Sequence, residues 1–169
     1  MLAVSARRST RRTAVSRLRT LTLLTLLLLN VQFFIGMLVN LYIQVPAIHP
    51  GANSSNYFLG VVQGIVWALV SGPLALLVHV ALGLLLVLVS FILMGLAIAS
   101  RRLSWIISSI LGWIGVVGAG FNGASFLNYG HDLSSLLMST GFVLAMVSYM
   151  LGLALAGKGE ALSCEETSS

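Results

Sequence analysis

Residues 121 to 132 read FNGASFLNYGHD and gather polar side chains in a chain that has little charge elsewhere. The run supplies amides, a phenol, an imidazole and a carboxylate. All of these can hold a small polar ligand, and the last two can also bind a metal ion. We therefore expect a ligand-binding site that combines this run with one histidine of an earlier apolar segment: His79, Asn122, Asn128, Tyr129, His131 and Asp132.

The three histidines of the chain, His49, His79 and His131, are candidate metal ligands. Imidazole nitrogens bind copper, zinc and iron, and a histidine paired with a second histidine or a methionine can hold haem. His79 with His131 or Met138 would be such a pair, so haem b or copper is a candidate cofactor. Asp132 could ligate the metal or orient an imidazole through its other ring nitrogen.

Each of these residues also has a structural interpretation. Asp132 is placed to cap a following helix, and His49 beside Pro50 is typical of a turn. His79 could hydrogen-bond a neighbouring helix, for instance a side chain of the first apolar segment. Amides at membrane depth usually join helices in the same way, and the chain has several of them: Asn30, Gln32, Asn40, Gln44 and Gln63.

The composition indicates a membrane protein. Of 169 residues, 58% are hydrophobic and only 8% are charged, whereas about 25% of residues are charged in soluble domains. The single Cys164 has no partner for a disulfide or a metal cluster. Six of the nine basic residues precede the first apolar segment, which favours contact with the lipid bilayer and its anionic head groups, and no nucleic-acid binding. These are Arg7, Arg8, Arg11, Arg12, Arg17 and Arg19.

The apolar segments predict an all-α fold, a bundle of four transmembrane helices with one short helix. A span needs about 20 residues, so residues 57–100 are too long for one helix and are expected to break at Ser71-Gly72-Pro73. The paired arginines before the first segment resemble an export signal, but a cleaved apolar region has about 7 to 15 residues, so we expect an uncleaved helix. The predicted spans are 21–45, 73–99, 105–122 and 133–156, and the short helix is 57–70.

Four spans place all nine Lys and Arg residues on one side of the membrane, as the positive-inside rule favours. Five spans would put Arg101 and Arg102 on the opposite side. Residues 1–20 are then a basic cytoplasmic segment, 21–156 the membrane domain, and 157–169 a polar cytoplasmic tail. The 121–132 run lies outside, and the short helix either lies in the outer interface or re-enters the outer leaflet.

Small residues recur at alternating steps of three and four on two spans, which predicts that these spans pack closely with left-handed crossings. One series is Ser108, Gly112, Gly115, Ala119 and Asn122; the other is Ser134, Met138, Gly141, Ala145, Ser148 and Gly152. A third face on the second span carries His79, Gly83, Leu86, Ser90, Leu93 and Ala97. The sequence therefore predicts a packed bundle.

Several stretches resemble known membrane proteins. VPAIHPGA at 45–52, HVALGLLLVL at 79–88 and GAGFNGASFLNYGHDLSSLLM at 118–138 resemble a group of small four-helix inner-membrane proteins of actinobacterial type, which carry no assigned activity. This resemblance implies a multi-pass protein of the bacterial cytoplasmic membrane. The pattern His-x-x-x-Gly-Leu-Leu at His79 is also similar to the haem-ligating helices of cytochrome b561-like proteins, which implies His79 as a haem ligand.

Three functions follow from these patterns. No Walker loop, Ser-His-Asp set or HExxH motif is present, which favours a non-enzymatic accessory or small-ligand-binding protein with an outer polar pocket. Its partners would be other membrane proteins or copies of itself. A haem- or copper-linked redox or assembly factor is the alternative, and a small transporter with a polar path along the amides of the first span is the third.

Overall fold

The structure is a computed structural model that describes the backbone of residues 2–165 and the side chains of residues 16–155. Within these residues it is all-helical, with the elements α1 (Leu2–Tyr42), α2 (Tyr57–Val70), α3 (Leu74–Ser100), α4 (Leu103–Tyr129) and α5 (Asp132–Glu165). Four stretches are long and apolar enough to cross a membrane: Ser16–Tyr42, Leu74–Ser100, Leu103–Tyr129 and Asp132–Leu155. The predicted fold class is confirmed, and the chain is a multi-pass membrane protein.

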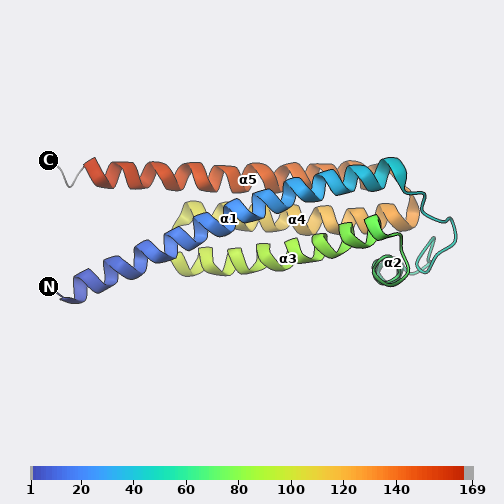
Figure 1. Cartoon of the computed structure of the whole chain (residues 1–169), viewed down its shortest axis with the longest axis horizontal. Helices are drawn as coiled ribbons and strands as arrows, with labels where there is room; N and C mark the ends of the chain where they lie inside the picture. The colour runs from blue at the N-terminus through green and yellow to red at the C-terminus, as the bar shows by residue number, and fades with distance from the viewer. Residues whose placement is uncertain (1, 166–169) are drawn as a thin grey trace.

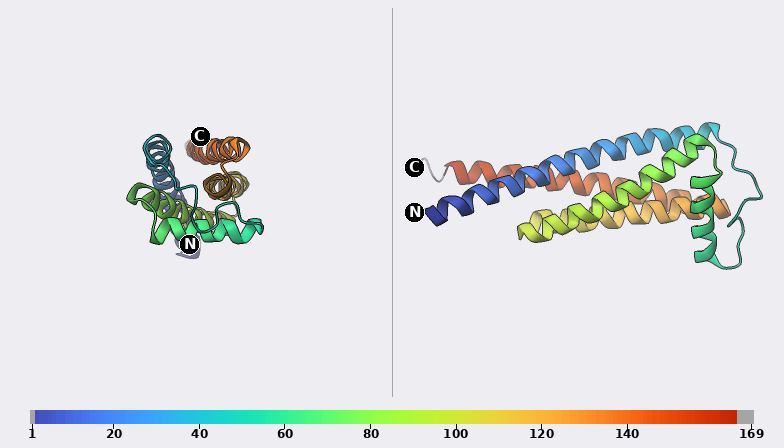
Figure 2. Two further views of the ribbon diagram at one scale, coloured as in Figure 1. Left: turned by 90° about the vertical axis from the view of Figure 1, so that its right-hand side faces the viewer. Right: turned by 60° about the horizontal axis from the view of Figure 1, so that its bottom comes forward.

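The four long helices lie side by side, and α2 crosses one end of the bundle (Figure 1). Figure 2 shows α2 running across the long axis, with the loop from α1 beside it. The start of α1 and the end of α5 are both at the opposite end of the bundle (Figure 1). The end that carries α2 is therefore the end at which residues 43–56 and 121–132 meet, and we call it the cap end.

The third long helix differs from its prediction because α4 continues through most of the 121–132 run. The run was expected to connect two spans after Asn122, but α4 ends only at Tyr129. No proline interrupts this stretch, and a helix satisfies its own backbone hydrogen bonds, which is the favoured state in lipid. The helix stops at Gly130, whose φ of 65° is left-handed and whose N–H donates to the Phe126 carbonyl. Only Gly130 and His131 separate α4 from α5.

Glycines set the close approach of α4 and α5, the most extensive helix pair of the bundle. A Cβ on Gly115 would lie 2.6 Å from the Gly141 carbonyl oxygen and 2.7 Å from the Ala145 nitrogen. The two backbones are therefore in contact, as the spacing of small residues predicted. Further along the pair, the ring of Tyr149 lies against Gly112.

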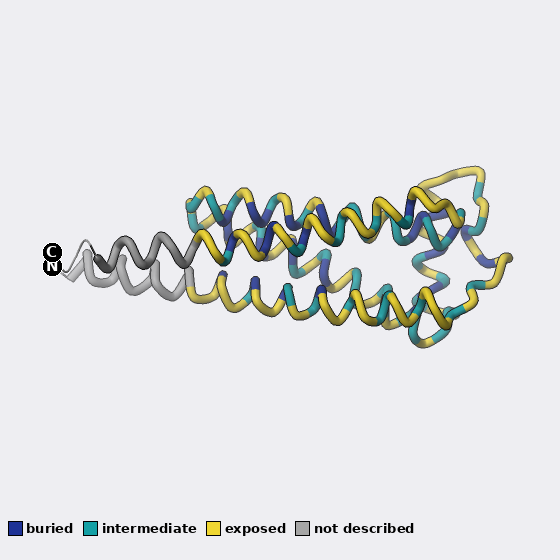
Figure 3. The backbone as a smooth tube through the Cα atoms, turned by 90° about the horizontal axis from the view of Figure 1, so that it is seen from above, coloured by how far each residue is buried: buried dark blue, intermediate teal, exposed yellow. Residues whose placement is uncertain are grey.

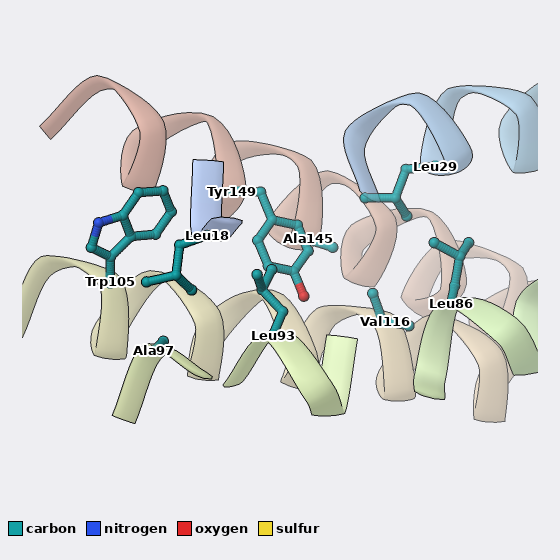
Figure 4. Packing of buried hydrophobic residues seen from close by; sticks show 9 residues of the cluster. All are labelled: Leu18, Leu29, Leu86, Leu93, Ala97, Trp105, Val116, Ala145 and Tyr149. Atoms are coloured by element: carbon teal, nitrogen blue, oxygen red, sulfur yellow. The ribbon is translucent and has the colours of Figure 1, made fainter. Parts of the chain in front are cut away.

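The buried apolar cluster extends through the half of the bundle that lies away from α2. Figure 4 shows it in successive levels, from Trp105 and Leu18 through Tyr149 and Leu93 to Leu86 and Leu29. Trp105 and Tyr149 are the largest fully buried side chains in the described residues, each 1% exposed. Figure 3 shows the buried positions turned inward along the long helices, with exposed positions on the outer surface.

Serine and threonine hydroxyl groups also lie in this buried interior, and they donate hydrogen bonds to backbone carbonyls of their own helices. Thr22 donates to the Leu18 carbonyl at 2.8 Å, and Ser90 donates to the Val87 carbonyl at 2.9 Å. Thr25, Ser108 and Ser109 bond their own helices in the same manner. Because these side chains satisfy themselves locally, they pack in the core without a partner across the bundle.

The backbone contact of α4 and α5 at Gly115 can be tested by substitution. Gly115→Ala should lower the free energy of unfolding by about 1 to 3 kcal/mol, because the new methyl group forces α4 and α5 apart. Gly118→Ala is the matched control on the same helix, since a Cβ there meets nothing within 4 Å. Thermal unfolding in detergent measures both variants. Equal stability of the two would contradict a backbone contact at Gly115.

Candidate functional site

Asn128 is the centre of the cap end. Its side chain is 4% exposed, and its Nδ2 donates to the Gly60 carbonyl in α2 at 2.8 Å. Its own carbonyl accepts a hydrogen bond from the Asn53 N–H of the preceding loop at 3.1 Å. Asn128 therefore holds α2 and the loop against the end of α4.

Three glycines make room for this contact. A Cβ on Gly64 would overlap the Asn128 side chain, and one on Gly51 would collide with the Gly60 carbonyl. Gly51 also has a φ of 94°, which side chains other than glycine rarely adopt. The Gly60-x-x-x-Gly64 spacing thus presents the bare side of α2 to α4 and the loop.

Tyrosine and serine hydroxyl groups connect the elements that meet at the cap end. Tyr57 donates to Ser125 Oγ at 2.8 Å, and Ser125 Oγ lies 3.1 Å from Ser134 Oγ on α5. Tyr129 donates to the Ser54 carbonyl at 3.1 Å and stacks on Tyr57, with 5.2 Å between ring centroids. Asn56 caps the start of α2 by accepting from the Leu59 N–H at 3.1 Å. These contacts connect α2, α4, α5 and the loop.

His49 belongs to the same structure. It is 9% exposed and stacks on Trp67 of α2, with 4.5 Å between ring centroids. Its Nδ1 lies 3.1 Å from the Pro50 carbonyl and its Nε2 lies 3.3 Å from the Leu127 carbonyl. A neutral imidazole carries one N–H, so it donates to one of these carbonyls at a time. Both nitrogens thus face backbone acceptors.

His79 lies away from this group, in α3 against α1. Gln32 Nε2 donates to the His79 carbonyl at 3.1 Å and lies 3.4 Å from the ring Nε2. Gly36 leaves space for the imidazole, because a Cβ there would lie 2.9 Å from His79 Cε1. The prediction of a bond between His79 and the first span is confirmed. Gln32 Oε1 and His79 Nδ1 are buried without a hydrogen-bond partner.

The remaining predicted site residues, His131, Asp132 and Asn122, do not take part in the hydrogen bonds around Asn128. His131 and Asp132 are exposed at the turn between α4 and α5. His131 stacks on Tyr129 at 6.2 Å. Asp132 is the first residue of α5, where its charge suits the helix dipole, but its side chain makes no capping hydrogen bond. Asn122 donates to the Gly118 carbonyl of its own helix at 2.8 Å.

The predicted sites are therefore only partly assembled. Asn128 and Tyr129 meet at the cap, whereas His79 pairs with Gln32 on other helices. Within the described residues, no three His, Cys, Asp or Glu side chains gather where they could hold a metal ion. In this part of the chain, His49, His79 and His131 each contact a different neighbour and do not converge on one site.

The larger hollow lies on the outer side of α2. It is an open groove of about 320 Å³. It is bordered by Pro50 of the loop and by residues of α2, including Trp67. Its lining residues are Pro50, Val62, Gln63, Val66, Trp67, Val70 and Ser71. A smaller hollow of about 150 Å³ at the other end of the bundle is bordered by Arg17 and Ser100.

The sequence analysis did not anticipate this groove. Its lining is mostly apolar, so it carries none of the polar signals that identified the 121–132 run. Gln63 was noted only as a helix-joining amide, and Trp67 was not singled out. Gln63, Trp67 and Ser71 follow one another at intervals of four residues, which places their side chains on one side of a helix. This spacing is the signal in the sequence that could have indicated the groove.

No family model, curated protein or solved structure matches the chain significantly.

Loss of the Asn128 amide should loosen the attachment of α2 to the end of α4. Asn128→Ala leaves the Gly60 carbonyl unpaired and should cost about 1 to 3 kcal/mol in unfolding free energy. Amide hydrogen exchange should accelerate in α2 and at Asn53. Asn122→Ala is the matched control, because the Asn122 amide bonds only its own helix. Unchanged exchange in α2 after Asn128→Ala would refute the role of this amide.

Proposed function

We propose that the protein is a non-enzymatic accessory protein of the bacterial cytoplasmic membrane that acts by binding at its cap end. The groove on α2 is the contact surface in this proposal. Its occupant is another membrane component, or a small ligand at the outer leaflet, with an apolar body and one hydrogen-bonding group. The groove itself is the observation that carries the proposal.

The chemistry of the groove supports binding. Apolar side chains dominate its wall, and Gln63 and Ser71 are its uncharged polar groups. Ligand sites commonly combine an apolar lining with a few placed polar groups. Trp67, one of the lining residues, stacks on His49 of the loop.

Three polar residues at the cap end have structural contacts that suit a binding protein. The side chains of Asn128, Tyr129 and His49 all face backbone carbonyls of the cap. A catalytic group needs an atom free to reach a substrate. These residues work instead as a scaffold that holds α2 across the bundle.

The surface of α2 supports a position in the outer membrane interface. Phe58, Val62, Val66 and Val70 recur every four residues and are all more than half exposed. A short helix lying across the bundle with such a face is suited to the boundary between acyl chains and head groups. The crossed position in Figure 2 favours this over re-entry into the leaflet.

The alternatives receive less support. A redox factor would need a set of ligands, and the three histidines contact Trp67, Gln32 and Tyr129 separately. A transporter would need a polar path, but Gln32 faces α3 whereas Asn30 and Asn40 are exposed on α1. The buried threonine and serine hydroxyls of the core donate to carbonyls of their own helices.

A photo-crosslinking residue at position 63 tests the groove. In native membranes it should give one discrete adduct, identified by mass spectrometry as a lipid, a small molecule or a protein. Leu59 is the control position, because it is exposed on the same helix but lies outside the groove. The same adducts from both positions, or none from position 63, would remove the support for a binding groove.

Cysteine labelling tests the orientation. In a Cys164→Ser background, Ser55→Cys at the cap end should react with a membrane-impermeant maleimide in intact cells. Ser16→Cys at the opposite end should react only after permeabilisation. Both side chains are exposed. The reverse pattern would invert the proposed orientation, and labelling of both in intact cells would contradict opposite sides for the two ends.

A further inference from the structure

Helix α1 has two different faces. The inward face packs mainly on α3, and each of its members is buried or half-buried: Leu18, Thr22, Thr25, Leu29, Gln32 and Gly36. The opposite face follows the same alternating steps of four and three residues, but each of its members is exposed: Leu23, Leu27, Asn30, Phe34, Met37 and Leu41. We call this second series the outer stripe of α1.

Asn30 is the polar member of the outer stripe. It lies next to the midpoint of the apolar stretch Ser16–Tyr42 and is therefore near the middle of the span. Its Nδ2 donates to the Leu26 carbonyl at 2.8 Å. Within the described residues, the Oδ1 atom and the second N–H have no hydrogen-bond partner. An amide with two unpaired groups is unfavourable in hydrocarbon.

Two exposed hydroxyl groups on α5 are better satisfied. The exposed hydroxyls of Ser139 and Thr140 on α5 donate to carbonyls of their own helix. A hydroxyl has one proton, so one such bond satisfies it as a donor, whereas an amide has two. Gln32 reaches His79 across the bundle, whereas the exposed Asn30 bonds only its own helix within the described residues. Its free amide groups are therefore available to another molecule in the membrane.

We propose that a second copy of the chain covers the outer stripe, so that α1 forms a parallel, left-handed, two-fold helix pair with Asn30 at its centre. Copies inserted in the same orientation bring Asn30 to the same depth. An amide is both a donor and an acceptor, so two of them satisfy each other reciprocally across a two-fold axis. A different partner would need its own polar side chain at that depth.

The spacing of the stripe fits this geometry. A repeat that alternates four and three residues keeps one face toward a partner in a left-handed pair. Continued toward the start of α1, the same steps reach Thr20 and Ser16, which are both exposed. By the same spacing, Arg17 and Arg19 fall beside the stripe and not on it. These two charges therefore leave the contact line free.

Self-association through α1 is separate from binding at the α2 groove. The two surfaces lie on different helices, and neither needs the other to form. A failure of the α1 contact leaves the proposed binding function untouched, and the reverse also holds.

Dilution of donor- and acceptor-labelled full-length chain in lipid vesicles tests the contact by energy transfer. The unaltered chain should associate, and Asn30→Leu should weaken association about 3- to 30-fold, because it removes the interhelical amide bonds. Asn30→Gln keeps an amide and should retain association. Asn40→Leu is the matched control, since Asn40 is exposed on α1 but lies off the stripe. An unassociated chain, or equal association of Asn30→Leu and the unaltered chain, overturns the proposal.

Disulfide trapping defines the face. In a Cys164→Ser background, Leu27→Cys and Phe34→Cys should each form covalent dimers in oxidised membranes. Leu24→Cys should not, because it is exposed on α1 at nearly the same depth but off the stripe. Since all three side chains are exposed, the variants should fold alike, which circular dichroism can verify. Equal trapping at Leu24→Cys would contradict the stripe as the contact.

Discussion

Hydrogen-bond partners are scarce inside a bilayer, and the structure follows from that scarcity. A polar side chain in lipid must find its partner within the protein, because no water is present to supply one. Short hydroxyl side chains such as Thr22 and Ser90 find it in their own helix, so they stay in the core without joining elements. Longer side chains reach further. Gln32 joins α1 to α3, and Asn128 joins α4 to α2.

Glycine determines where such contacts can form. Lipid gives no hydrophobic attraction between helices, so helices gain most where their backbones approach closely. Gly115 and Gly141 permit this between α4 and α5, and Gly60 and Gly64 permit it between α2 and its neighbours. Only in the second case does the approach also serve a polar side chain, because the space left by Gly64 is occupied by the Asn128 amide. The cap therefore combines close packing with hydrogen bonding at one place.

The sequence predicted what depends on local patterns. The four spans and the short helix follow from hydropathy and from the break at Pro73, and the seam at Gly115 follows from residue spacing. The sequence did not predict that α4 continues to Tyr129, because the polar end of this helix resembles a loop until its partners in loop 43–56 are known. His49 looked like a turn residue or a metal ligand, and its actual neighbour, Trp67, lies in another element. Convergence of distant elements is not encoded in spacing, so the separation of the three histidines could not be foreseen.

The distribution of satisfied and free groups also bears on function. At the cap end, Asn128, Tyr129 and His49 face backbone carbonyls, and Tyr57 donates to Ser125. The buried atoms left without partners, such as Asn128 Oδ1 and His79 Nδ1, border neither hollow. What the described chain offers to other molecules is therefore mainly apolar surface, the groove on α2 and the outer stripe of α1, each with very few hydrogen-bonding groups. Surfaces of that kind recognise by shape and by one or two polar contacts, which suits the proposed binding at α2 and the proposed self-association through α1.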